Sequence, residues 1–294
     1  MQVKPVRKAI IAAAGFGTRF LPQTKALPKE MLPLVDKPII QYIVEELVDA
    51  GIEDIVIVTG YHKRSIEDHF DTISADLYNN LKQGNKLKLL EETKKISNLA
   101  NFAYIRQKGP YGSATPVLNA EHLIGDEPFI YTFADDFIEA SPSRFKQMVD
   151  VYSKTGSCVL TCIPVSNDAD YDRYGIVAGT EIEPGLIKMS TIVEKPGKRN
   201  APSNLASVSG YLLTPKIFKY LHASKEVIPD GSEFYIQPSM QMYIESGGEI
   251  LAYEVKNGKY HDTGNKIEYL KTVVEYALKH EDLKKEFRAF LDSI

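Results

Sequence analysis

Glycines and basic side chains gather near the N-terminus in a pattern suited to phosphate binding. Gly15 and Gly17 follow a short apolar run, and glycine lets the backbone turn tightly and bring N–H groups close to phosphate oxygens. Arg19, Lys25 and Lys29 follow within the same loop and carry the cations that bind phosphate. We therefore expect a triphosphate-binding loop; the alternatives are a plain turn and a solvated basic loop.

Two better-known phosphate motifs do not fit this loop. The dinucleotide-binding fingerprint needs a glycine three positions after its second glycine, and Phe20 holds that position. The P-loop needs a Gly-Lys-Ser/Thr sequence after four residues, and Gly15 again leads to Phe20. The sequence therefore disfavours both a P-loop nucleotide site and an NAD-dependent dehydrogenase.

Carboxylates at two distant points of the chain suit a divalent metal. Asp135 and Asp136 end an apolar run, and a carboxylate at the C-terminal end of a parallel strand points into the ligand crevice. Asp262 lies far along the chain in the sequence HDTGN. Mg²⁺ takes one or two protein carboxylates and completes its shell with phosphates and water. We expect a Mg²⁺ site; the alternative for each Asp is a helix cap or a turn residue.

An acid and a base stand side by side at the end of a further strand. Glu194 and Lys195 precede Pro196, and neighbours in a strand face opposite sides. Both therefore reach one site only if the backbone twists locally. The alternative is a surface ion pair, which contributes little stability.

Apolar runs and helical stripes predict the elements that position these residues. Continuous apolar runs of the kind buried in a parallel sheet predict strands at 8–14, 54–59, 101–107, 128–134, 157–165, 187–194, 205–214 and 250–255. Apolar positions at helical spacing predict helices from Pro38 to Gly51, near 116–123, near 142–154, from 215 and twice in the C-terminal segment. We expect an α/β fold with a Rossmann-like, mostly parallel mixed sheet flanked by helices.

Composition limits the partners of the chain. Its 294 residues are 44% hydrophobic with a net charge of −4, so no global basic field attracts nucleic acid or anionic lipid. The N-terminal apolar run is too short for a membrane span and lacks a signal-peptide layout. Cys158 and Cys162 share one strand face without further metal ligands, which predicts buried free thiols. We expect a cytoplasmic protein that binds neither nucleic acid nor membrane.

The N-terminal loop also resembles the signature of the sugar-1-phosphate nucleotidylyltransferases. It reads GFGTRFLPQTKALPKEMLPLVDKPIIQYIVEEL, and the paired lysines of TKALPKEMLP are typical of the bacterial uridylyltransferase branch. Later motifs follow in the family's order: RQ…YG, ADD, YGI, VEKP, SGYLL and HDTGN. The resemblance therefore covers most of the chain.

The resemblance implies a reaction and a set of site residues. UTP and glucose 1-phosphate would give UDP-glucose and pyrophosphate by in-line attack on the α-phosphorus, with Mg²⁺ as cofactor. Arg19 and Lys29 would neutralise the leaving pyrophosphate, and Lys195 would hold the sugar phosphate. The remaining implied roles are nucleotide binding by Ala13, Gly15, Gly17, Lys25, Gln107 and Gly112, sugar binding by Gly175, Glu194 and Gly210, and metal binding by Asp135 and Asp262.

The resemblance also implies how the chain is organised. We expect one domain over 1–294, mainly nucleotide-binding over 1–165 and mainly sugar-binding over 166–264, with a helical tail over 265–294. We expect a homo-oligomer, a dimer or a tetramer.

The chain departs from the family pattern in two places. Residues 113–116 read Ser-Ala-Thr-Pro where relatives read Leu-Gly-His-Ala. Residues 231–240 read GSEFYIQPSM where many relatives have Gln-Leu-Thr-Asp, a segment that flanks the sugar or forms an oligomer contact. The alternatives left open are a pyrophosphorylase for dTTP or another sugar 1-phosphate, and a non-catalytic sugar-nucleotide sensor. The intact carboxylates and lysines argue against a sensor.

Overall fold

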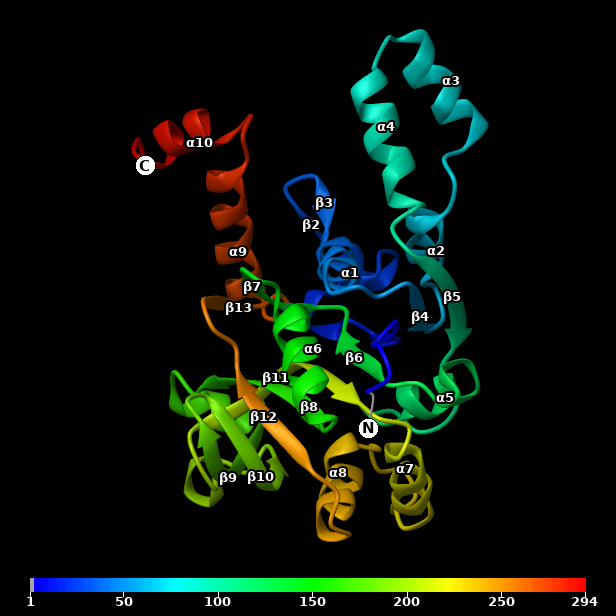
Figure 1. Ribbon diagram of the computed structural model, residues 1–294. Coiled ribbons are helices and arrows are strands. Elements are labelled where there is room, and N and C mark those ends of the chain that lie inside the picture. The colour runs from blue at the N-terminus through cyan, green and yellow to red at the C-terminus, as the bar shows by residue number, and fades with distance from the viewer. Residues whose placement is uncertain (1–2) are drawn as a thin grey trace.

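A nine-stranded mixed sheet forms the centre of the protein (Figure 1). The computed structural model describes residues 3–294, without the side chain of Ser209. The strand order is β5-β4-β1-β6-β11-β8-β12-β10-β9. In that order the strands span Asn101–Arg106, Asp54–Thr59, Lys8–Ala13, Phe129–Phe133, Leu205–Leu213, Cys158–Pro164, Ile250–Glu254, Leu186–Glu194 and Gly175–Glu183.

Parallel and antiparallel pairing divide this sheet. Parallel pairs join β5, β4, β1 and β6, and a further parallel pair joins β8 to β12. Strands β11, β10 and β9 pair antiparallel with their neighbours. The α/β class and the mixed sheet are confirmed. Antiparallel pairing has a larger share than predicted, because a two-residue turn at Pro184 and Gly185 folds β9 and β10 into a hairpin that the sequence analysis missed.

Helices cover both faces of the sheet. Ile10 packs toward one hydrophobic core and its neighbour Ile11 toward the other, so β1 is buried on both sides and reads as a continuous apolar run. One face carries α1 (Ile39–Asp49), α2 (Arg64–Phe70) and α6 (Arg144–Thr155), and the other carries α5 (Thr115–Ile124), α7 (Ile217–Glu226) and α8 (Ile236–Glu245).

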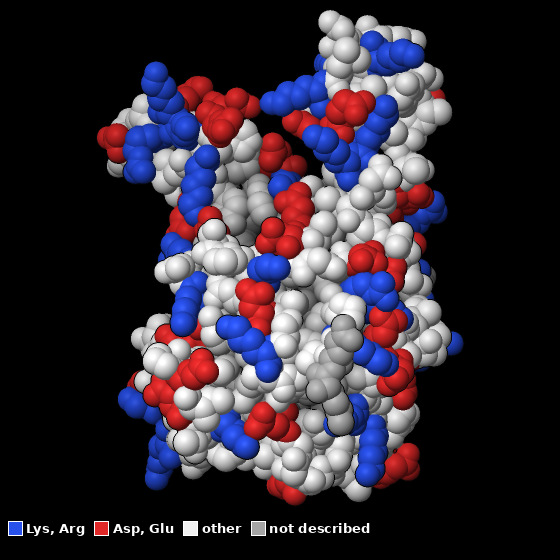
Figure 2. Space-filling view, in the orientation of Figure 1, with Lys and Arg blue, Asp and Glu red and all other residues white. Residues whose placement is uncertain are grey.

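Two helical pairs project from the same end of the molecule (Figure 1). They are α3 (Ala75–Gln83) with α4 (Leu87–Ile96), and α9 (Lys266–Lys279) with α10 (Lys284–Leu291). The second pair was predicted from its apolar stripes. The first was not predicted; α3 and α4 each bury a single side chain, Leu81 and Leu90 respectively. Figure 2 shows a hollow between the two pairs and a surface on which basic and acidic side chains are interspersed.

Two short ladders lie outside the main sheet. One joins β2 (Pro33–Leu34) to β3 (Lys37–Pro38), and the other joins β7 (Asp136–Ala140) to β13 (Gly258–Asp262). The second ladder connects segments that are more than a hundred positions apart, which the local pattern did not predict.

Two predictions from the composition can be compared with the structure: the buried free thiols and the lack of a membrane span. Cys158 and Cys162 are free and buried in one core, as predicted, and burial raises the pKa of both thiols. Residues 3–294 contain no helix that is both long enough and apolar enough to cross a membrane.

Candidate active site

Two adjoining cavities lie at the C-terminal ends of the central strands. The larger, of about 610 Å³, opens toward β9 and β10, and the smaller, of about 250 Å³, opens toward β1 and β5. They share four lining residues: Ser113, Phe133, Asp135 and Tyr235. Their position is the usual ligand crevice of an open α/β sheet.

The smaller cavity collects three of the six residues predicted to bind a nucleotide, together with one predicted to act on the leaving group. The three are Gly15, Gln107 and Gly112, and the fourth residue is Lys29. The side chain of Ala13 instead is buried in the core on the α1 face, while Ala12 and Ala14 line the cavity. The nucleotide-binding role of Ala13 therefore stays a prediction.

Lys29 lies where the two cavities meet. Its ammonium forms an ion pair with Asp135, which lines both cavities. Glycines make room for it, because a Cβ on Gly15 would lie 3.6 Å from the Lys29 Cε and a Cβ on Gly17 would lie 3.3 Å from the Lys29 Cβ. Burial disfavours the ammonium charge, but the carboxylates of Asp135 and Glu30 outweigh burial and raise the pKa of Lys29. The side chain is therefore a cation at neutral pH.

A second ion pair, which the sequence analysis missed, lies next to Lys29. The Lys63 Nζ lies 2.8 Å and 2.6 Å from the two carboxylate oxygens of Glu30. The side chains are 7% and 0% exposed, respectively. Burial raises the pKa of Glu30 and lowers the pKa of Lys63, and the attraction between the two side chains opposes both shifts.

The other residues of the phosphate loop differ in their distance from the site. Arg19 lines the larger cavity, and its guanidinium donates to the Gly264 carbonyl at 3.3 Å. Gly17 has a φ of 66° and accepts a hydrogen bond from the Thr24 hydroxyl at 2.7 Å, so it shapes the loop. Lys25 is exposed, outside the described linings of both cavities. The structure thus places Arg19 in the larger cavity and Lys29 in the smaller one, and leaves Lys25 at the margin.

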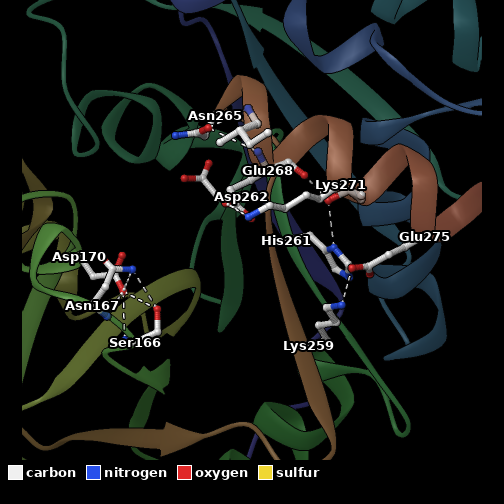
Figure 3. Close-up of polar contacts among 12 residues, drawn as sticks. Ser166, Asn167, Asp170, Lys259, His261, Asp262, Asn265, Glu268, Lys271 and Glu275 are labelled. Carbon is white, nitrogen blue, oxygen red and sulfur yellow. Dashed lines mark hydrogen bonds and ion pairs between the residues drawn. The ribbon is translucent and has the colours of Figure 1, made fainter. Parts of the chain in front are cut away.

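The predicted carboxylates meet because β7 pairs with β13. Asp136 lies opposite Asp262 in that ladder, and Asp135 directly precedes it. A Cβ on Gly264 would lie 3.0 Å from the Asp135 Oδ2 and 3.2 Å from the Asp262 Oδ1, so both oxygens face one small space. Burial raises the pKa of Asp262, and the charge of Asp135 raises it further. Figure 3 shows Asp262 leaving β13 away from His261, which turns toward Glu275.

This pair of carboxylates fits Mg²⁺. Within residues 3–294 no group of three or more His, Cys, Asp or Glu side chains is arranged to hold a metal. Mg²⁺ does not need one, because it binds through one or two carboxylates together with phosphates and water. The ammonium of Lys29 already pairs with Asp135, which shows that a cation can lie beside this carboxylate.

Two tyrosines orient the carboxylates. The Tyr260 hydroxyl donates to the Asp136 Oδ2 at 3.2 Å, and the Tyr174 hydroxyl donates to the Asp262 Oδ2 at 3.4 Å. The two rings pack edge to face with centroids 5.9 Å apart. Asp136 is thus a positioned residue of the larger cavity and not a turn cap.

Glu194 and Lys195 both line the larger cavity, as the local twist predicted for them requires. β10 ends at Glu194, and Lys195 has a φ of 46°, in the left-handed region that non-glycine residues rarely adopt. The Lys195 Nζ lies 3.6 Å from the Glu194 Oε1 and 5.2 Å from the centre of the Tyr235 ring. The strain of this conformation, roughly 1–3 kcal/mol, is typical of functional sites.

Unpartnered polar atoms line the same cavity around Gly175. A Cβ on Gly175 would lie 3.2 Å from the Glu194 Oε2 and 3.5 Å from the Gln237 Nε2. The Glu194 Oε2 and the Gln237 Oε1 are buried, and neither has a hydrogen-bond partner among the described residues. Burial raises the pKa of Glu194, and the charge of Lys195 partly offsets that. Buried oxygens of this kind require donors, and a ligand rich in hydroxyl groups supplies them.

Gly210 is placed differently from the other predicted sugar-binding residues. It is buried in β11, and a Cβ there would lie 3.2 Å from the Phe145 ring of α6. Ser207, Val208 and Tyr211 of the same strand line the cavity instead. The sugar-binding role of Gly210 stays a prediction.

The two departures from the family pattern contact each other. Phe234 donates its N–H to the Tyr111 carbonyl at 2.6 Å and accepts from the Ala114 N–H at 2.9 Å. The Ser113 hydroxyl accepts from the Ile236 N–H at 3.1 Å. The segment 231–240 therefore flanks the ligand cavities, where Glu233, Tyr235 and Gln237 line them. Its unusual sequence was the signal that could have found these residues.

Comparison with known proteins agrees with this geometry. A model of the nucleotidyl transferase family matches residues 8–278. The chain belongs to the nucleotidyl transferase family. The UTP–glucose-1-phosphate uridylyltransferase of Bacillus subtilis (strain 168) is 45% identical to this nucleotidyl transferase over 292 residues, 99% of this chain and 98% of that protein. The resemblance inferred from the motifs is therefore confirmed.

Solved structures give the same result for the fold of this nucleotidyl transferase. A structure of UDP-glucose pyrophosphorylase complexed with UDP-glucose has a TM-score of 0.82 at 39% identity and covers 94% of this chain and 100% of its own. A UTP-bound UGPase from Acinetobacter baumannii has a TM-score of 0.86 at 35% identity and covers 97% and 98%.

Proposed function

We propose that this nucleotidyl transferase makes UDP-glucose and pyrophosphate from UTP and glucose 1-phosphate. The observation that carries the proposal is the pair of adjoining cavities that share Asp135. One has glycine backbone and the cation Lys29, and the other has buried oxygens that need hydroxyl donors. The names of the relatives, which mention UTP, glucose 1-phosphate and UDP-glucose, support these substrates.

The reaction needs positioned charges and no covalent enzyme intermediate. An oxygen of glucose 1-phosphate attacks the α-phosphorus of UTP in line. The new phosphorus–oxygen bond forms as the bond to the bridging oxygen of pyrophosphate breaks, and that electron pair leaves with pyrophosphate. Negative charge grows on the leaving group, and Lys29 and Arg19 neutralise it.

The larger cavity holds the sugar phosphate. Lys195 binds the attacking phosphate, since its ammonium stands in the cavity beside the Tyr235 ring. Glu194 and Gln237 accept hydrogen bonds from sugar hydroxyls, while Gly175 leaves the space between them open. This geometry turns one phosphate oxygen toward the smaller cavity.

The smaller cavity holds UTP. Gln107 and the backbone of Gly112 read the uracil edge, and the backbone of Gly15 lies alongside. A contact of the Ala13 backbone with the nucleotide stays a prediction. Gly17 shapes the loop around the triphosphate, and Lys25 adds charge at its margin. Asp135 and Asp262 would hold Mg²⁺, which would supply positive charge against the phosphates.

A pyrophosphate-release screen tests the proposal. UTP, dTTP, CTP, ATP and GTP are each combined with several sugar 1-phosphates, and we expect the fastest release from UTP with glucose 1-phosphate. Faster release from dTTP would make the protein a thymidylyltransferase. Release from no combination would favour a non-catalytic sensor. Light scattering of the same sample measures the oligomeric state, which we predict to be a dimer or a tetramer.

A further inference from the structure

The Glu30–Lys63 ion pair lies directly beside the residue that faces the leaving group. We propose that this pair positions Lys29 for the transfer reaction, and the proposal rests on the function given above. Lys63 binds both Glu30 oxygens, at 2.8 Å and 2.6 Å, in an environment that leaves the two side chains 7% and 0% exposed. Lys63 is buried and lines neither cavity, while Glu30 lines the smaller cavity beside Lys29 with a side chain that is 0% exposed. We therefore expect Lys63 to act on catalysis through Glu30 and its neighbour Lys29.

The backbone links the pair to Lys29. Lys29 and Glu30 belong to one short 3-10 turn, Lys29–Met31, closed by the Met31 N–H to the Pro28 carbonyl at 2.9 Å. Lys63 comes from the segment between β4 and α2, while Asp135, the partner of Lys29, follows β6. The turn is therefore tied to two different strand ends through neighbouring side chains of opposite charge.

Charge explains why the pair matters to Lys29. Glu30 is the carboxylate nearest to Lys29 in sequence, and without Lys63 it would compete with Asp135 and the phosphates for the Lys29 ammonium. Because Lys63 holds both Glu30 oxygens, the Lys29 charge is left for the junction of the cavities. The four groups alternate in sign from Lys63 through Glu30 and Lys29 to Asp135.

Stability alone does not account for such a pair. A buried ion pair loses much of its attraction to the cost of removing two charges from water, and apolar residues of similar size often replace it without loss of stability. A buried Glu30–Lys63 pair beside Lys29 is therefore better explained by what it does to its neighbour.

Lys63→Met, Lys63→Arg and the double variant Glu30→Gln/Lys63→Met test the proposal. For Lys63→Met we expect kcat to fall on the order of tenfold to a hundredfold, as for a slightly misplaced catalytic group. The KM for pyrophosphate in the reverse reaction should rise, and the KM for glucose 1-phosphate should stay at the parent value. Lys63→Arg should recover most of the lost activity. Lys88→Met, which breaks an exposed ion pair with Glu92, is the matched control and should change neither constant.

The double variant separates positioning from folding. It leaves no unpaired buried charge, so its thermal midpoint should exceed that of Lys63→Met, and it carries the test if the single variant does not fold. We expect its kcat and pyrophosphate affinity to stay below those of the parent. Parental values in a stably folded double variant would overturn the proposal and leave the pair a structural one.

Calorimetric binding of inorganic pyrophosphate and UTP needs no turnover and keeps the two proposals apart. If the parent binds pyrophosphate but releases none from any nucleotide and sugar phosphate, the proposed function fails while the positioning can still be judged. Weaker pyrophosphate binding by the double variant would then support it, and equal binding would contradict it.

Discussion

Lys29 and Asp135, 106 positions apart in the chain, form an ion pair at the junction of the two cavities. The carboxylate side of the pair is also one of the two that face the space beside Gly264. The cation assigned to the leaving group is thus held at the junction by the carboxylate assigned to the metal. This relationship makes both residues testable by substitution.

Lys29→Ala should lower turnover far more than Lys25→Ala, a substitution in the same loop. Removing one preorganised group that stabilises developing charge costs roughly 10²–10³ in rate. Lys25→Ala is the control, because Lys25 is exposed at the margin of the site, and we expect only a small loss. Steady-state kinetics of both variants, with thermal midpoints to confirm folding, decide this. Similar losses for the two lysines would contradict the assignment of Lys29.

Activity should depend on a divalent cation through Asp135 and Asp262. EDTA should abolish pyrophosphate release and added Mg²⁺ should restore it. Asp135→Asn and Asp262→Asn keep the side-chain shape but remove charge, so each should raise the Mg²⁺ concentration needed for half-maximal rate. Asp126→Asn, at an exposed position, is the control. A rate that EDTA leaves unchanged would make the carboxylates structural.

The affinity for glucose 1-phosphate should fall in acid through Glu194. Burial raises the pKa of Glu194 above its ordinary 4.5, and a protonated carboxyl no longer accepts two hydrogen bonds from hydroxyls. As the pH falls below neutral, the KM for glucose 1-phosphate should therefore rise at a higher pH than an ordinary carboxylate would cause, while the KM for UTP follows less. Glu194→Gln should start from a high KM and lose this dependence, which separates it from ionisation of the substrate. A variant with the parental pH profile would show that another group titrates.

Gly112→Ala should damage the nucleotide site. Gly112 has a φ of 127°, and a Cβ there would lie 2.3 Å from the Phe234 carbonyl oxygen, so the two loops would have to separate. Gly125→Ala is the matched control, with a φ of 63° and nothing within 4 Å of a Cβ, and should cost only about 1–2 kcal/mol of stability. We expect Gly112→Ala to show the lower thermal midpoint and a weaker affinity for UTP by calorimetry. Parental UTP affinity in Gly112→Ala would disconnect the Phe234 contact from nucleotide binding.

Nucleotide preference should follow the hydrogen-bonding edge of the base. Uracil presents an N–H donor between two carbonyls, and cytosine replaces the donor with an acceptor and one carbonyl with an amino group. Each buried polar group left unpaired costs about 1–3 kcal/mol, or about 5- to 150-fold. UTP should therefore exceed CTP by more than tenfold, and dTTP, which keeps the edge, should come second. Competition among five nucleotides at equal concentration measures the order.

The local pattern was enough to predict much of the frame and part of the site. Strand β4 spans Asp54–Thr59, as predicted, and its four central residues, 55–58, are apolar because both faces of the strand are buried. Gly15, Arg19 and Lys29 were predicted from one loop, since residues close in sequence stay close in space. The twist at Lys195 followed from the need for two strand neighbours to reach one cavity.

Only the tertiary structure decided which distant or alternating residues meet. Asp135 and Asp262 face one space because β7 pairs with β13. The pairing of two segments so far apart in the chain leaves no periodic pattern in the sequence of either one, so it could not be predicted. Gln237 reaches the cavity through the contact of its segment with Ser113. Glu30 is fully buried against Lys63, which comes from another strand end. Ala13 and Gly210 face away from the cavities, because Ala13 points into the core on the α1 face and Gly210 faces Phe145 of α6. Only the packing of the helices on the sheet decides which face that is. Such facts arise from packing between elements, where the free energy of each contact depends on both partners.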